Sequence, residues 1–261
     1  MKLIILCGGF GTRLREETSI KPKPMVEIGG KPILWHIMKH YSHYGYNEFI
    51  LALGYKGDSI KNYFLNYYNL NSDFTINLSS GDVEFKKKND NSENWKITLV
   101  DTGKNSMTGF RVKLAGKYIT EDNFMLTYGD AVSTVNIDKL VKLHVKQNTI
   151  GTVTGVFPPS RFGDLVAEEN IVKSFKEKKK STSIENMING GFFVFKKKFL
   201  DAIPNDSSCD LEKLPLEKLT MDKELSVYKH TDFWQCMDTY RDYLLLNKLW
   251  NDNPKWKLWK A

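Results

Sequence analysis

The chain has 261 residues, of which 41% are hydrophobic, and its formal net charge is +7. It can therefore bury one large core, whereas three cysteines without a C-x-x-C pair form neither a disulfide framework nor a zinc site. The lysines are scattered and form no basic and aromatic stripe, so we expect no nucleic-acid partner. The first apolar run ends in glycines after five residues, and no run approaches the ~18 apolar residues of a membrane span. We therefore expect a cytoplasmic protein without a membrane partner.

Apolar runs and helical patterns alternate along the first 70 residues. Residues 3–7 and 49–53 are continuous apolar runs with the length and β-branched content of buried strands. Apolar side chains at helical spacing predict one helix from residue 33 to the glycine at 45, and another from an Asp58 cap to about residue 68. This order of strand, helix, strand and helix predicts a doubly wound α/β sheet.

The rest of the chain continues this alternation. Further strands are predicted at residues 97–101, 124–128, 152–157, 187–195 and 225–228, with short strands near 165 and 171. Helices are predicted over 137–144, over 210–221 with an interruption at Pro215, and near the C-terminus. Without a repeat or a linker, these elements indicate a single Rossmann-like domain, a doubly wound mixed sheet flanked by helices. A small β excursion after residue 157 is placed to cover a substrate.

A glycine-rich loop, Gly8-Gly9-Phe10-Gly11-Thr12-Arg13, follows the first strand. Its three glycines let the backbone turn sharply and bring bare N–H groups close to a ligand, and Arg13 adds a fixed cation. The spacing is not the G-x-G-x-x-G of dinucleotide-binding folds, because Leu14 stands where a glycine is needed. The loop therefore predicts a polyphosphate site of another kind; a tight turn without a ligand is the alternative.

The segment Lys21-Pro22-Lys23-Pro24 restrains two cations between prolines. Proline fixes its own φ and restricts the preceding residue, so each lysine is expected to be held extended. A lysine that meets a phosphate gains from such restraint, since less entropy is lost on binding. The alternative is a plain surface loop.

Two aspartates, Asp130 and Asp238, each follow an apolar strand but lie far apart in the sequence. In open α/β sheets, ligands bind beyond the carboxyl ends of strands. Two carboxylates from such positions can converge on one Mg²⁺, which takes few protein ligands and keeps its other positions for water and phosphate oxygens. Each aspartate alone could instead cap a helix.

Five motifs resemble the sugar-1-phosphate nucleotidylyltransferase family between residue 2 and about residue 250. They are LCGGFGTRL, KPKPMVEIGGKPILWHIM, TYGD, MINGGFFV and FWQCMDT, of which the second resembles the cytidylyl branch of the family. The resemblance implies transfer of a cytidylyl group from CTP to α-D-glucose 1-phosphate. The products would be CDP-glucose, for surface-polysaccharide biosynthesis, and pyrophosphate.

Site residues follow from the resemblance by position. It implies nucleotide contacts from Leu6, Cys7, Gly8, Gly9, Phe10, Gly11, Thr12, Arg13, Ser106, Arg111 and Gly129. It implies catalytic roles for Lys23, Arg13 and Asp130, an Mg²⁺ cofactor held by Asp130 and Asp238, and sugar-phosphate contacts from Glu177, Lys178, Asn189 and Gly190. Two positions depart from the family pattern: Cys7 replaces the usual alanine, and Lys179 replaces a proline.

We expect one domain, 1–261, in which residues 1–150 mainly bind the nucleotide. Residues 151–261 would mainly bind the sugar phosphate and form the C-terminal helix. The expected partners are CTP, a sugar 1-phosphate and further copies of the chain in a homo-oligomer, with the aromatic-rich segments 63–68 and 250–259 as either contact surfaces or core. Three alternatives stay open: another sugar 1-phosphate, UTP or dTTP in place of CTP, and a non-catalytic sensor of nucleotide or sugar phosphate.

Overall fold

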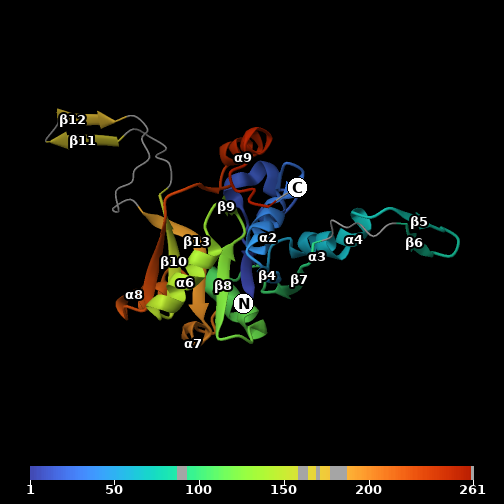
Figure 1. Cartoon of the computed structure of the whole chain (residues 1–261), viewed down its shortest axis with the longest axis horizontal. Helices are drawn as coiled ribbons and strands as arrows, with labels where there is room; N and C mark the ends of the chain where they lie inside the picture. Colours follow the sequence, from blue (N-terminus) through green and yellow to red (C-terminus); the bar gives the residue numbers. More distant parts are fainter. Residues whose placement is uncertain (87–92, 158–163, 169–170, 177–186, 260–261) are drawn as a thin grey trace.

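A seven-stranded, mostly parallel sheet forms the centre of the protein in the computed structural model, which describes residues 1–86, 93–157, 164–168, 171–176 and 187–259 (Figure 1). In the strand order β14-β10-β13-β8-β1-β4-β7, β13 runs antiparallel to both neighbours and every other pair is parallel. The strands are β1 Leu3–Cys7, β4 Glu48–Leu53, β7 Lys96–Asp101, β8 Asn123–Tyr128, β10 Gly151–Val156, β13 Ile188–Lys196 and β14 Leu225–His230. The predicted doubly wound mixed sheet is confirmed.

Helices cover both faces of this sheet. Their bounds are α1 Arg15–Thr18, α2 Ile33–His43, α3 Gly57–Leu65, α4 Tyr67–Leu70, α5 Thr108–Ala115, α6 Ile137–Gln147, α7 Phe199–Ala202, α8 Leu214–Met221 and α9 Tyr240–Asp252. Alternate side chains of β1 point to opposite faces: Leu3 and Ile5 pack with α2 and α6, whereas Ile4 and Leu6 pack with α5, α7 and α8. This two-sided burial is the reason that β1 is apolar at every position. Within the described residues, no helix is long and apolar enough to cross a membrane.

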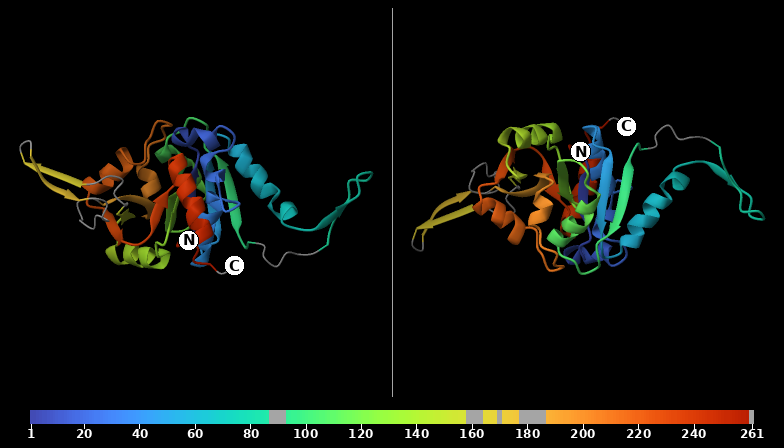
Figure 2. Two further views of the ribbon diagram at one scale, coloured as in Figure 1. Left: turned by 90° about the horizontal axis from the view of Figure 1, so that it is seen from above. Right: turned by 90° about the horizontal axis from the view of Figure 1, so that it is seen from below.

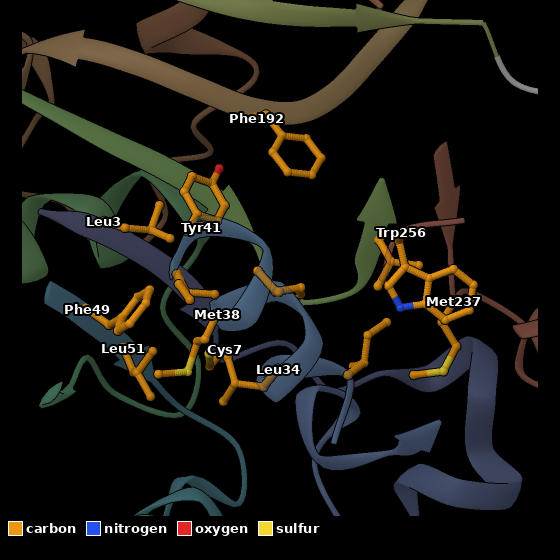
Figure 3. Close-up of a cluster of buried hydrophobic side chains, with 14 of the residues drawn as sticks. Leu3, Cys7, Leu34, Met38, Tyr41, Phe49, Leu51, Phe192, Met237 and Trp256 are labelled. Carbon is orange, nitrogen blue, oxygen red and sulfur yellow. The ribbon is translucent and has the colours of Figure 1, made fainter. Parts of the chain in front are cut away.

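The core on the α2 side also includes the C-terminal segment. Figure 3 shows Leu34, Met38 and Tyr41 of α2 among side chains of the sheet, and the Tyr41 ring stacks on Phe192 with ring centroids 6.0 Å apart. Trp256 is 1% exposed and belongs to the same cluster. The aromatic segment at 250–259 therefore contributes to the core through Trp256.

In the part of the chain that the structure describes, four small antiparallel pairs supplement the main sheet: β2 Glu27–Ile28 with β3 Lys31–Pro32, β5 Phe74–Ile76 with β6 Val83–Phe85, β9 Ala131–Ser133 with β15 Trp234–Cys236, and β11 Asp164–Glu168 with β12 Ile171–Lys176. The β11–β12 hairpin is the predicted β excursion. It projects from one end of the protein, and the β5–β6 hairpin projects from the other end beyond α3 and α4 (Figures 1 and 2). We call residues 57–85, which include α3, α4, β5 and β6, the arm.

Two local predictions about helices were wrong. Asp58 does not cap the first arm helix, which starts at Gly57 after Lys56 in the left-handed region (φ 53°) and ends before Asn66. Pro215 does not interrupt a helix, because α8 begins only at Leu214 and proline is well tolerated in a first turn.

Candidate active site

A cavity of about 400 Å³ opens at the carboxyl ends of β1 and β8, where the glycine-rich loop and Gly129-Asp130 leave the sheet. It is lined by every residue predicted to bind nucleotide, namely Leu6, Cys7, Gly8, Gly9, Phe10, Gly11, Thr12, Arg13, Ser106, Arg111 and Gly129. Lys23, Asp130 and Asp238 line the same cavity. The structure thus brings together groups that are separated by more than 200 positions in the sequence.

The pairing of β9 with β15 brings the two aspartates together. Asp130 immediately precedes β9. Asp238 follows β15, from which it is separated by Met237. The Met237 N–H donates to the Asp130 carbonyl oxygen at 2.8 Å, which extends the antiparallel pairing to the aspartates. Neither aspartate caps a helix: a strand follows Asp130, and Thr239 caps α9 with Asp242 in a capping box.

Lys23 lies between these two carboxylates. Its Nζ donates to Asp130 Oδ2 at 2.7 Å and to Asp238 Oδ1 at 2.6 Å. Its side chain is 13% exposed, and those of Asp130 and Asp238 are 29% and 19% exposed. Burial alone would lower the pKa of the Lys23 ammonium, but the charges of Asp130 and Asp238 and the hydrogen bonds to them outweigh burial and hold that pKa above its ordinary value. The lysine therefore stays charged in this partly buried position.

The backbone of Lys23 is restrained, but not as the prolines predicted. Lys23 starts a 3-10 turn over Lys23–Met25 and is not extended. The turn is closed by the Met25 N–H, which donates to the Pro22 carbonyl at 2.8 Å. Pro24 is buried against Gly129, where an added Cβ would lie 3.1 Å from Pro24 Cγ. Tertiary packing of Pro24 thus outweighs the local preference of a residue before proline.

Arg13 extends the charged group toward solvent. Its Nη1 donates to Asp238 Oδ2 at 2.8 Å, while its side chain remains 73% exposed. Two cations and two carboxylates therefore meet at the cavity, with Arg13 at its exposed side. An exposed guanidinium next to bare backbone N–H groups is suited to meet the oxygens of a phosphate.

Arg111 lines the cavity, and its guanidinium also holds the surrounding loops together. It is 4% exposed, and its guanidinium donates to main-chain or hydroxyl oxygens of the surrounding loops, namely Gly8 O, Leu53 O, Thr102 Oγ1, Gly103 O and Lys104 O at 2.7–3.2 Å. Gly8 must be a glycine here, because a Cβ would lie 2.2 Å from Arg111 Nη1. Arg111 lines the cavity, and its N–H groups donate hydrogen bonds to oxygens of the protein. It therefore fixes the shape of the glycine-rich loop.

Cys7 fits the position where the family usually has alanine. Its side chain is buried at the end of β1. Burial raises the pKa of the Cys7 thiol far above its ordinary value, and the nearby Arg111 charge opposes this shift only in part. The reactive thiolate is therefore not populated near neutral pH.

The predicted sugar-phosphate residues are placed only in part. Glu177 and Lys178 lie outside the described residues. Asn189 and Gly190 lie at the start of β13 and do not line the cavity, but Asn189 Nδ2 donates to the hydroxyl of Tyr128, which does, at 3.2 Å. Sequence reasoning missed Tyr128, Asn105 and Thr108 as cavity residues. Tyr128 had a signal, since it directly precedes the Gly-Asp of the TYGD motif.

Comparison with known proteins identifies the family of this chain. The sequence pattern of the nucleotidyl transferase family matches residues 2–257. The chain belongs to the nucleotidyl transferase family. It is 46% identical to a probable glucose-1-phosphate cytidylyltransferase of Bacillus subtilis (strain 168), over 99% of this chain and 100% of that protein. It is 47% identical to a glucose-1-phosphate cytidylyltransferase of Salmonella typhi, over the full length of both.

Solved structures share the fold of this nucleotidyl transferase. HddC from Yersinia pseudotuberculosis superposes with a TM-score of 0.67 at 24% identity, over 95% of this chain and 98% of that one. The UTP-bound UGPase from Acinetobacter baumannii superposes with a TM-score of 0.70 at 18% identity, over 98% and 95%.

The contrast between the two arginines is testable. We expect Arg111→Met to lower the free energy of unfolding by about 3 kcal/mol, because it leaves several part-buried or buried oxygens without a donor. Arg13→Met should change it by less than about 1 kcal/mol, since that ion pair is exposed. Urea denaturation of both variants measures the two values. Equal losses would contradict the assignment of Arg111 as a clamp of the loop.

Proposed function

We propose that this protein is a glucose-1-phosphate cytidylyltransferase, which joins CTP and α-D-glucose 1-phosphate to give CDP-glucose and pyrophosphate. The full-length identity of 46–47% to relatives of that name supports the substrates. One observation carries the chemistry: Lys23 lies between Asp130 and Asp238 beside the glycine-rich loop, in one cavity. A site for a triphosphate needs such a loop, and a site for transfer also needs charge placed at the reacting phosphate.

The reaction is a direct displacement. A phosphate oxygen of the sugar 1-phosphate attacks the α-phosphorus of CTP and forms the new P–O bond. The bond from the α-phosphorus to the bridging oxygen of the β-phosphate breaks, and pyrophosphate leaves. No covalent enzyme intermediate is required. The loop N–H groups bind the phosphates, and the Arg13 and Lys23 cations neutralise the charge that develops on them.

We propose that Asp130 and Asp238 hold the Mg²⁺ that accompanies the nucleotide. Their fit to a cation is supported by the Lys23 ammonium, which one oxygen of each carboxylate contacts within 2.7 Å. Among the described residues, no third acidic, His or Cys side chain completes a metal cluster, which suits an ion that takes its other ligands from water and phosphate. The bound ion would supply charge neutralisation at the reacting phosphate. Because two cations cannot share this position without strong repulsion, Lys23 must leave the carboxylates and turn to the triphosphate.

We assign the nucleotide mainly to residues 1–150 and the sugar phosphate mainly to residues 151–261. Under this division Glu177, Lys178, Asn189 and Gly190 face the sugar phosphate. Asn189 is exposed and lies one hydrogen bond from Tyr128 at the cavity wall, which supports this side for the sugar. The substrates are metabolites of the cytoplasm, where we place the protein.

We also propose that the arm binds a second copy of the chain. A two-stranded hairpin is at best marginally stable alone in water, yet β5 and β6 and their turn expose Phe74, Ile76, Leu78, Val83 and Phe85. The base of the arm carries an apolar groove of about 460 Å³, lined by Phe64, Leu65, Tyr67, Tyr68, Glu93, Trp95, Ile97 and Leu99. An apolar tip and an apolar groove on one chain are complementary surfaces for two copies.

A substrate panel tests the proposed activity. CTP, UTP, dTTP and GTP are each combined with the 1-phosphates of glucose, galactose and mannose, and release of pyrophosphate is measured. We expect CTP with glucose 1-phosphate to give the highest kcat/KM. Higher turnover with another pair would correct the substrates, and binding without turnover of any pair would favour a sensor.

The role of Lys23 can be tested by measuring metal binding in the absence of substrates. Lys23→Met removes the cation from between Asp130 and Asp238, so we expect Mn²⁺, measured by electron paramagnetic resonance, to bind the nucleotide-free variant at least about tenfold more tightly than the wild type. Turnover with Mg²⁺ should fall about a hundredfold or more, since the lysine no longer meets the phosphates.

The matched control is Lys21→Met, whose ion pair with Glu27 lies outside the cavity. It should change neither value appreciably. Unchanged Mn²⁺ affinity in Lys23→Met would show that the metal does not bind between the two carboxylates.

If the arm binds a second copy of the chain, charged residues at its apolar tip should prevent oligomer formation. We expect the double variant Ile76→Glu, Leu78→Glu to lower the mass found by sedimentation equilibrium to that of a monomer, because it places charges on the apolar tip. Met221→Glu alters an exposed apolar side chain on α8, outside the arm, and should leave the mass unchanged. A monomeric wild type, or a double variant with the mass of the wild type, would contradict the proposal.

A further inference from the structure

A carboxylate outside the predicted site connects two of its walls. Glu212 lies just before α8 and is half-buried. Its Oε1 accepts a hydrogen bond from the Tyr128 hydroxyl, and its Oε2 accepts one from Thr108 Oγ1 at 2.8 Å. Tyr128 and Thr108 both line the cavity, although they belong to β8 and α5. One side chain therefore holds two hydroxyls of the site.

The direction of each hydrogen bond is determined by what the groups can donate. The Tyr128 hydroxyl donates its single proton to Glu212 Oε1. The hydroxyl oxygen then accepts from Asn189 Nδ2 at 3.2 Å. The Asn189 Oδ1 accepts from the Gly191 N–H at 2.8 Å, which excludes the flipped amide. Glu212, through Tyr128, and the Gly191 N–H together hold the Asn189 amide in one orientation.

We propose that Glu212 is a positioning residue for the sugar 1-phosphate, acting through Tyr128 and Asn189. This inference rests on the proposed function. Within the described residues, the second N–H of Asn189 Nδ2 has no protein partner, and Asn189 is exposed. That N–H is a donor for a sugar hydroxyl or a phosphate oxygen, and its direction is set before the substrate arrives. Preorganised donors bind more tightly because less freedom is lost on binding.

The neighbouring residues support a rigid arrangement on this side of the cavity. The Trp234 Nε1 donates to the Gly190 carbonyl at 2.8 Å, which fixes the start of β13. Thr108 Oγ1 accepts from the Leu211 N–H at 2.9 Å, and its hydroxyl lies 2.8 Å from Glu212 Oε2 and 3.4 Å from Asp210 Oδ1, so Glu212 is its nearer acceptor. The carboxylate is thus the common acceptor of the group. Glutamine at position 212 keeps the shape but replaces one acceptor with a donor, so it cannot accept from both hydroxyls.

The test uses steady-state kinetics of Glu212→Gln, Tyr128→Phe and Asn189→Ala in the full chain. We expect each to raise the KM for glucose 1-phosphate about tenfold, as loss of one oriented hydrogen bond does, with the KM for CTP changed less than about twofold. The double variant Glu212→Gln, Asn189→Ala should be no worse than Asn189→Ala alone, because both changes remove the same contact.

A structural role alone predicts a different result. If Glu212 had only a structural role, Glu212→Gln would lower the thermal midpoint and kcat. The effects of Glu212→Gln and Asn189→Ala on the kinetics would then multiply in the double variant, and this result would overturn the inference. An equal rise in the KM for CTP would also overturn it. Glu217→Gln, on the exposed surface of α8, is the matched control and should behave as wild type. Failure of the proposed function would be visible separately, since the wild type itself would then not turn over glucose 1-phosphate.

Discussion

The ion group of Lys23 with Asp130 and Asp238 is the interaction on which the site depends. Two carboxylates this close repel each other, and the ammonium between them removes that repulsion in the absence of substrate. Under the proposed function, a divalent ion would take the position of the lysine, and the released ammonium would lie next to the glycine-rich loop. We propose that binding of metal and binding of nucleotide are coupled in this way through one side chain, because each would favour the other.

The fold creates this group by joining distant segments at one edge of the sheet. The parallel pairing of β1 with β8 places the glycine-rich loop beside Gly129 and Asp130. The pairing of β9 with β15 then brings in Asp238 from the last quarter of the chain. Arg111 donates a hydrogen bond to the Gly8 carbonyl, so the protein itself holds the loop in place. The charged side chains of the cavity therefore lie beside a loop whose shape the protein itself defines.

Much of this arrangement could be predicted from the sequence, where a pattern is local. The apolar run of β1, the glycines after it and the two strand-end aspartates each have a short-range signal, and they do meet around one cavity. Three features had no such signal. The turn at Lys23 depends on burial of Pro24 against Gly129. The clamp by Arg111 depends on four carbonyls from three separate segments, and the role of Glu212 depends on hydroxyls from two other elements. Each requires the tertiary structure.

A crystal structure of the protein with CTP and Mg²⁺ would show the position of Lys23 in the loaded site. We predict that the triphosphate lies along the glycine-rich loop, that the cation contacts both Asp130 and Asp238, and that Lys23 Nζ has moved from these carboxylates to the phosphates. A complex in which the nucleotide is bound while Lys23 still bridges Asp130 and Asp238, with the cation held elsewhere, would contradict it.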